Sequence, residues 1–173
     1  SNFSENNKYA FFPSGALGWK VSNEAFLEDS DVISNLKLRY SYGLTGNPSI
    51  APFQSLANFQ PIYSAVGDQP VNAVLPNQLA KPDLKWETSY QSNFGLDLGF
   101  INNRISLSLD VYNIRTEDLI LGDSSVPEYI GFLNNESLRN VGEITNKGVE
   151  ISLTTRNIAN TDFSWTTDFN WSR

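Results

Sequence analysis

The stretch KPDLKWETSYQSNFGLDLGFINNRISLSLDVYNIRTEDLIL spans residues 81–121 and alternates apolar and polar side chains in two runs. Side chains along a β-strand point to opposite faces in turn, so each run predicts a strand with one apolar and one polar face. The apolar face of the first strand carries Trp86, Thr88, Tyr90, Ser92, Phe94, Leu96, Leu98 and Phe100. The apolar face of the second carries Ile105, Leu107, Leu109 and Val111.

A tight turn at Asn102-Asn103 joins the two predicted strands and sets their register. Asn tolerates the positive φ that a two-residue hairpin turn requires. The resulting cross-strand pairs are all apolar: Phe100–Ile105, Leu98–Leu107, Leu96–Leu109 and Phe94–Val111. A slip of one residue would place apolar side chains opposite polar ones along the whole hairpin, so the sequence specifies this register strongly.

Four further segments alternate in the same way, which predicts an all-β fold of roughly six antiparallel, up-and-down strands. They are residues 9–21, 36–44, 143–156 and 163–173. Between the first two strands, residues 22–31 predict a turn with one helical turn capped by Ser22. The apolar residues of the last two strands are odd-numbered, so the register predicts a connecting loop of about three or five residues within 157–162.

The connections differ in length at the two ends of the predicted strands. Residues 46–80 and 122–140 are long connections, whereas the turns at the other ends are shorter. Outer-membrane β-barrels have the same asymmetry, with short periplasmic turns and long external loops. On that reading the aromatic residues Trp19, Phe100 and Trp165 lie at the periplasmic rim and Trp86 at the outer rim, with Trp171 as a further interfacial anchor.

Composition excludes several functions. The chain of 173 residues has a net charge of −7 and neither cysteine nor histidine. The acidity argues against nucleic acid as a partner, and the missing residue types remove disulfides, common zinc sites and histidine-based catalysis. We expect no enzyme activity, no catalytic residues, no metal and no cofactor.

Two architectures explain the alternation. A transmembrane β-strand needs only about 9–11 residues with one apolar face, but a soluble β-sandwich, for example a carbohydrate-binding module, also alternates because one face of each sheet is core. Strands of about 15 residues exceed the usual length. Together with polar faces rich in Ser, Thr and Asn and the segregated connections, that length favours the membrane barrel.

Several segments also resemble the C-terminal barrel region of SusC/RagA-type receptors, the TonB-dependent outer-membrane transporters of Bacteroidota. The most specific motifs are LKWET (84–88), GLDLG (95–99) and NVGEITNKGVE (140–150). The similar stretches 1–19, 36–47, 81–100, 102–121, 140–153 and 162–172 follow the family's order and spacing.

The resemblance implies that residues 1–173 belong to the β-barrel domain of a nutrient receptor in the bacterial outer membrane. Such a barrel has about 22 strands and encloses a plug, and it would work with a SusD-like surface lipoprotein and the TonB complex to import glycans (oligosaccharides) or peptides. The matching stretches contain neither a plug nor a TonB-contacting segment. Six strands alone would leave open edges in the bilayer, so we expect the rest of a larger barrel to complete them.

Three sets of residues are functional candidates. The set expected to face lipid is Trp86, Phe94, Leu96, Leu98, Phe100, Ile105, Leu107, Leu109 and Val111. The set expected to face the lumen, either as ligand contacts or as structural ion pairs within the wall or with the plug, is Lys37, Arg39, Glu87, Asp97, Asp110, Glu150 and Asp168. The set expected to bind substrate, or else to pack the loops or contact the lipoprotein, is Phe53, Gln54, Asn58, Phe59, Tyr63, Tyr129 and Phe132.

Overall fold

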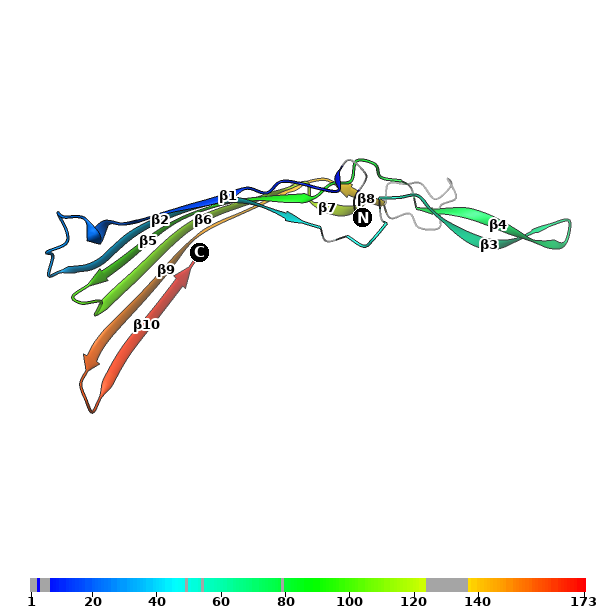
Figure 1. The fold of residues 1–173 in the computed structure, drawn as a ribbon. Coiled ribbons are helices and arrows are strands. Elements are labelled where there is room, and N and C mark those ends of the chain that lie inside the picture. Colours follow the sequence, from blue (N-terminus) through cyan, green and yellow to red (C-terminus); the bar gives the residue numbers. More distant parts are fainter. Residues whose placement is uncertain (1–2, 4–6, 49, 54, 79, 124–136) are drawn as a thin grey trace. The chain divides into compact units, whose positions relative to one another are not determined.

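The computed structural model describes residues 3, 7–48, 50–53, 55–78, 80–123 and 137–173. Its main feature is one antiparallel sheet in the order β1-β2-β5-β6-β9-β10 (Figure 1). The strands of this sheet are β1 (Ser14–Lys20), β2 (Ile33–Asn47), β5 (Glu87–Phe100), β6 (Ile105–Glu117), β9 (Glu143–Ala159) and β10 (Ser164–Ser172). Each strand pairs with the next one of the sheet along the chain, which confirms the six-stranded, up-and-down prediction.

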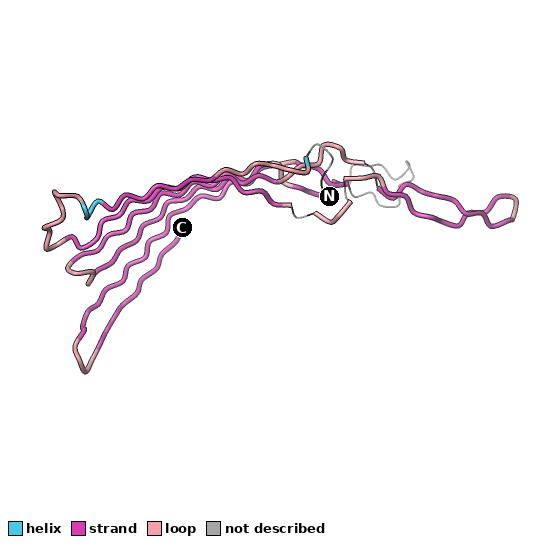
Figure 2. The backbone as a smooth tube through the Cα atoms, viewed as in Figure 1, coloured by secondary structure: helices cyan, strands magenta, loops and turns pink. Residues whose placement is uncertain are grey.

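The chain divides into two compact units, whose boundaries fall just before β1 and within β2, β5, β6 and β9. We call residues 13–45, 90–115 and 145–173 the sheet unit, and residues 1–12, 46–89 and 116–144 the loop unit. The turns β1–β2, β5–β6 and β9–β10 all lie at one end of the sheet unit (Figure 2). The predicted segregation of short connections is therefore present.

The β5–β6 turn follows the sequence prediction closely. Asn102 and Asn103 have φ of 55° and 56°, and the amide of Arg104 donates to the carbonyl of Ile101 at 3.1 Å. The Ser108 hydroxyl donates to Asp97 at 2.9 Å, as the predicted register requires. The turn differs in one respect: Ile101 also has a positive φ, of 52°, so regular pairing already ends at Phe100.

The β9–β10 hairpin confirms the predicted register but not the predicted loop length. Phe169 lies opposite Leu153 and Trp171 opposite Ile151, so apolar residues face each other as expected. The connection between Ala159 and Ser164 nevertheless holds four residues, not three or five. A β-bulge between Trp165 and Thr166 explains the difference, because its extra residue on β9 changes the parity of the loop.

The start of the chain differs more from the prediction. β1 begins only at Ser14, after Pro13, rather than at residue 9. The helical turn is a short 3₁₀ segment, η2 (Val21–Asn23). It is capped by Lys20 without a side-chain hydrogen bond, so the prediction of a Ser22 cap was wrong.

Two additional ribbons occupy parts of the segments predicted as long connections, and the second begins two residues before the predicted connection at residue 122. β3 (Asn58–Val66) pairs with β4 (Gln69–Gln78), and β7 (Ile120–Asp123) pairs with β8 (Ser137–Asn140). The turn between β3 and β4 has positive φ at Gly67 and Asp68, 58° and 61°. The sequence did not indicate these strands because their apolar residues do not alternate cleanly with polar ones.

The apolar face of the six-stranded sheet is not covered by a second layer of the described chain. The buried apolar side chains among the described residues are Phe3, Val21 and Leu84, none of which belongs to the sheet's strands. Leu17 is 77% exposed and Phe169 is 55% exposed. A β-sandwich would bury these residues between two sheets, so the structure does not favour the sandwich alternative.

Among the described residues, no helix is both long enough and apolar enough to cross a membrane.

Candidate functional site

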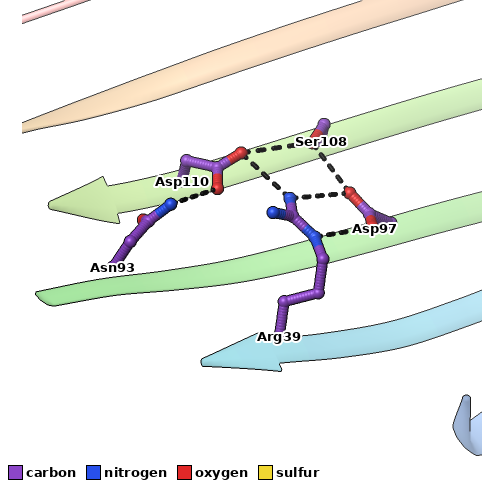
Figure 3. Close-up of polar contacts among 5 residues, drawn as sticks. All are labelled: Arg39, Asn93, Asp97, Ser108 and Asp110. Carbon is purple, nitrogen blue, oxygen red and sulfur yellow. Dashed lines mark hydrogen bonds and ion pairs between the residues drawn. The ribbon is translucent and has the colours of Figure 1, made fainter. Parts of the chain in front are cut away.

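An ion-pair cluster on the polar face of the sheet unit connects three neighbouring strands. Arg39 of β2 lies between Asp97 of β5 and Asp110 of β6 (Figure 3). Its Nε and Nη2 donate to the two carboxylate oxygens of Asp97 at 2.9 and 3.0 Å. Nη2 also donates to Asp110 at 3.1 Å. This two-pronged contact is the strongest geometry available to an arginine and a carboxylate.

Two neutral side chains complete the cluster. The Ser108 hydroxyl donates to Asp97 Oδ1 at 2.9 Å, and its oxygen lies 3.4 Å from Asp110 Oδ2. Asn93 Nδ2 donates to Asp110 Oδ1 at 3.2 Å. All four carboxylate oxygens therefore have a donor, and one cation balances two anions, which leaves a net charge of about −1 on this face of the sheet.

A glycine makes room for the arginine. A Cβ on Gly95 would lie 2.5 Å from Arg39 Cζ, so the guanidinium rests directly over the β5 backbone. Any larger residue would have to displace a side chain that is held by three hydrogen bonds. The sequence motif GLDLG (95–99) contains Gly95 but indicates no role for it, because the position of Arg39 depends on the β2–β5 register.

The structure brings together three of the seven residues predicted to face the lumen. The other four make none of the hydrogen bonds of this cluster. In the loop unit, Glu87 accepts hydrogen bonds from Asn47 Nδ2 at 2.7 Å and from the Ile120 amide at 2.8 Å. In the sheet unit, Asp168 accepts one from the Thr154 hydroxyl at 2.6 Å. Lys37 and Glu150 lie opposite Lys20 and Ser172.

An aromatic cluster forms the core of the loop unit. The Trp86 ring stacks on Phe3 at a centroid distance of 4.8 Å and meets the edge of Phe12 at 5.7 Å. Its Nε1 donates to the Asn7 carbonyl at 3.0 Å, and Leu84 nearby in sequence is 2% exposed. Trp86 was predicted to face lipid, yet this chain itself covers part of its ring, so lipid contact remains a prediction only for the exposed remainder.

Asn140 is a second organising residue of the loop unit. Its Oδ1 accepts from the Lys85 amide at 2.9 Å, and its Nδ2 donates to the carbonyls of Lys85 and Asp118 at 2.8 and 2.9 Å. Lys85 Nζ lies 2.7 Å from Asp118 Oδ2. These residues line a groove of about 410 Å³ together with Lys81 and Arg139. In the sequence, Asn140 stands out only as the first residue of the motif NVGEITNKGVE. Its role in these contacts was not predictable, because its partners lie 22 and 55 residues away.

The described members of the set predicted to bind substrate lie on the β3 strand and in the turn before it. Phe59 and Tyr63 lie on the same face of β3 and are 61% and 88% exposed. Asn58 precedes Phe59 at a register shift, and Phe53 lies in a turn with φ of 66°. The remaining members of the set, Gln54, Tyr129 and Phe132, lie outside the described residues.

Comparison with known proteins agrees with this geometry. The family model "TonB dependent receptor-like, beta-barrel" matches residues 1–173. TonB-dependent receptor P3 of Formosa agariphila is 53% identical over 100% of this chain, and the match covers 17% of that receptor. TonB-dependent receptor SusC of Bacteroides thetaiotaomicron is 37% identical over 98% of this chain, again covering 17% of the relative.

Solved structures show the same fold. The RagAB peptide importer in its open-open state matches 100% of this chain and 18% of the solved chain, with a TM-score of 0.83 and 32% identity. Its closed-closed state matches with a TM-score of 0.82. The chain thus spans about a sixth of the length of its relatives. It belongs to the TonB dependent receptor-like β-barrel family and forms a six-stranded segment of an outer-membrane barrel.

Proposed function

We propose that this chain supplies barrel wall and external loops to a TonB-dependent importer of nutrients across the outer membrane. The observation that carries the proposal is the single-layered sheet with an uncovered apolar face and a polar face joined by ion pairs. In a transmembrane barrel the first face contacts lipid and the second lines a hydrated interior. The relatives with matching sequence are receptors, not enzymes, and we propose the same for this chain.

The two faces of the β5–β6 hairpin would then have different surroundings. Lipid would contact the residues Phe94, Leu96, Leu98, Phe100, Ile105, Leu107, Leu109 and Val111. The lumen would contain Lys37, Arg39, Asp97, Asp110, Glu150 and Asp168, with Glu87 toward the external end. In this arrangement the Arg39 cluster links three strands of the barrel wall. Its net negative charge could interact with the plug or with a substrate that passes through the lumen.

The external segments 46–80 and 122–140 would contact substrate and partner. One structural neighbour is a peptide importer and one relative is SusC, so peptides and oligosaccharides are the substrate classes we propose, with a SusD-like lipoprotein as the partner and the TonB complex as the energy source. Exposed Phe59 and Tyr63 suit both ligands, because aromatic rings stack on sugar faces and on peptide side chains.

The placement of the two faces can be tested on the complete receptor in lipid vesicles. Nitroxide labels at two adjacent positions of β6, Leu107 and Ser106, sample opposite faces of one strand. We expect the label at 107 to relax with oxygen, which concentrates in lipid, and the label at 106 with a water-soluble nickel chelate. Protection of position 107 from both reagents would indicate a covering protein layer and contradict the proposal.

Import itself needs a second measurement. Cells that carry the complete receptor should accumulate labelled peptide or oligosaccharide only when TonB and the proton-motive force are intact. Accumulation that persists without TonB would contradict the proposed mechanism, even if the barrel is correctly inserted.

A further inference from the structure

Two lysines lie directly opposite each other on the polar face of the sheet unit. The β1–β2 register pairs Lys20 with Lys37 and, two residues along, Gly18 with Arg39. Opposite residues of an antiparallel pair project to the same face, so both lysines lie on the face that carries the Arg39 cluster. Lys20 is the last residue of β1, which places it at the end of the sheet where the short turns lie (Figure 2). We call Lys20 and Lys37 the lysine pair.

The lysine pair has no ion-pair partner in the part of the chain that the structure describes. Both lysines are exposed, and neither forms an ion pair there. The carboxylates of the neighbouring cluster, Asp97 and Asp110, are already bound by the Arg39 guanidinium (Figure 3). Like charges directly opposite each other destabilise an antiparallel pair, so the lysine pair costs stability unless an anion binds to it.

The Lys37 side chain lies toward β1, away from the carboxylates of the cluster. A Cβ on Gly18 would lie 3.5 Å from Lys37 Cε, so the aliphatic stem of this lysine passes beside a residue that has no side chain. Arg39, two residues along the same strand, instead lies over Gly95 of β5. The two cations of β2 therefore turn to opposite sides, and the ammonium end of Lys37 lies on the side of β2 that carries Lys20.

The acidic residues of the β1–β2 connection do not neutralise the lysine pair. Glu24 accepts a hydrogen bond from Trp19 Nε1 at 2.8 Å, and Trp19 lies on the opposite face because it directly precedes Lys20 in the strand. Glu28, Asp29 and Asp31 form no ion pair with either lysine. An anion for the lysine pair therefore has to come from outside the described residues.

We propose that the lysine pair binds a carboxylate of the plug, the segment that a barrel of this family would enclose. The proposal rests on the proposed function, because it requires a complete receptor whose polar face lines the lumen. A carboxylate that approaches this face can accept from both ammonium groups, and such charge-assisted contacts are strong. Lysine suits the task, because its compact charge carries three donors on a flexible stem.

Two other sources of an anion fit the geometry less well. A residue on a further wall strand beside β1 would lie two strand spacings, about 10 Å, from the backbone of Lys37. Such a residue could neutralise Lys20 but not the whole lysine pair. A substrate in transit would leave the two charges opposed whenever the lumen is empty. A resident segment of the receptor neutralises both lysines at all times.

Carbodiimide cross-linking of the complete receptor in detergent, without added substrate, tests the contact. This reagent joins an amine directly to a carboxylate that touches it, and mass spectrometry then identifies the linked peptides. We expect a link from Lys20 or Lys37 to an aspartate or glutamate of the plug. The Lys85–Asp118 ion pair, at 2.7 Å, is the internal positive control. Absence of the plug link while the Lys85–Asp118 link forms would overturn the proposal, and so would a link to a wall strand alone.

Neutral variants give a second test, in which the sign of the effect decides. With a plug carboxylate in place, K20Q/K37Q should lower the urea midpoint of unfolding and accelerate amide exchange in the linked plug segment about tenfold. Without a partner, the same variant would relieve the repulsion between the lysines and raise the midpoint. A raised or unchanged midpoint, or unchanged plug exchange, therefore contradicts the proposal.

Two control variants separate charge from other effects. K20R/K37R keeps both positive charges and should remain close to wild type in both measurements. K8Q/K147Q removes two exposed lysines elsewhere in the chain and should leave plug exchange within about twofold of wild type. A receptor that imports substrate in a TonB-dependent manner but shows neither the link nor the exchange effect contradicts only the plug contact and leaves the proposed function intact.

Discussion

The β5–β6 and β3–β4 hairpins have the same local structure but different surroundings. Both are antiparallel pairs joined by a turn with positive φ, at three successive residues in β5–β6 and at two in β3–β4. β5–β6 lies in the middle of a six-stranded sheet, whereas β3–β4 forms a sheet of its own. Two-stranded ribbons are marginally stable in water. The comparison therefore shows that the same hairpin geometry can occur in a large sheet or in an isolated ribbon, and that strand pairing alone does not determine what surrounds a hairpin.

The side chains explain why the two hairpins differ. Along β5–β6 one face is apolar and the other carries Asp97 and Asp110, so each face requires a different medium. The β3–β4 ribbon is uncharged except for Asp68 at its turn, and it contains Pro61, Pro70 and Pro76. All three prolines occupy register positions of the same parity. Proline has no N–H, so the backbone nitrogens at these positions must point away from the partner strand, toward the outer edges of the ribbon. The outer edges therefore lack hydrogen-bond donors there, which opposes the addition of further strands.

The largest effect on stability is expected from a charge placed on the apolar face of β6. Replacing Leu107 by arginine in the complete receptor should lower the free energy of unfolding from vesicles by about 2–4 kcal/mol, because the charge would enter the hydrocarbon region. Ser106→Arg is the matched control on the opposite face of the same strand, and it should cost less than about 1 kcal/mol. Equal losses in both variants would mean that the two faces share one environment.

The next prediction concerns the core of the loop unit. Trp86→Ala removes the stacking on Phe3 and the hydrogen bond to Asn7, at a cost of about 2 kcal/mol for a partly buried ring. Amide hydrogen exchange in β7 and β8 should accelerate about 30-fold, while exchange in the sheet unit stays unchanged. Trp171→Ala, on β10, deletes the same ring and should leave β7 and β8 protected. Acceleration in the sheet unit alone would contradict the assignment.

A smaller effect is expected from the ion-pair cluster. Arg39→Ala leaves two neighbouring carboxylates without their cation and should lower stability by about 1–3 kcal/mol in urea unfolding from vesicles. Gly95→Ala should cost about 1 kcal/mol, because the new Cβ meets the guanidinium. In the Arg39→Ala background, the Gly95→Ala substitution should cost almost nothing further. Additive losses would show that the glycine acts independently of Arg39.

The smallest change in stability should occur in the β3–β4 ribbon. Tyr63 is 88% exposed, so Tyr63→Ala should change the free energy of unfolding by less than about 0.5 kcal/mol. Substrate affinity should nevertheless fall several-fold if the ribbon binds ligand as proposed, measured by calorimetry with the peptide or oligosaccharide that the receptor imports. Tyr9→Ala, at a residue that is 93% exposed, is the control and should leave affinity unchanged. The ribbon would lose its proposed role if the two variants behaved alike.

Local sequence patterns are enough to specify the strands of the sheet, their order along the chain and the register of two hairpins. Because apolar and polar residues alternate along residues 86–111, the register predicted for the two strands places apolar residues opposite apolar ones. Asn102-Asn103 supplies the turn that this register needs. These features are local, because side-chain period and turn chemistry act over a few residues. The lumen-facing prediction likewise followed from alternation, but it could not show which of the seven charges meet.

Contacts between distant segments, in contrast, follow from how the strands pair in the folded sheet. Arg39 reaches Asp97 and Asp110 because β2 pairs with β5 rather than with β3, and nothing local to either strand specifies that neighbour. The same holds for Phe3 on Trp86 and for Asn140 on Lys85. The bulge in β9 also changed a loop length that parity alone predicted. Pairing across 50 or more residues depends on the combined fit of whole strands, which a period-two pattern does not encode.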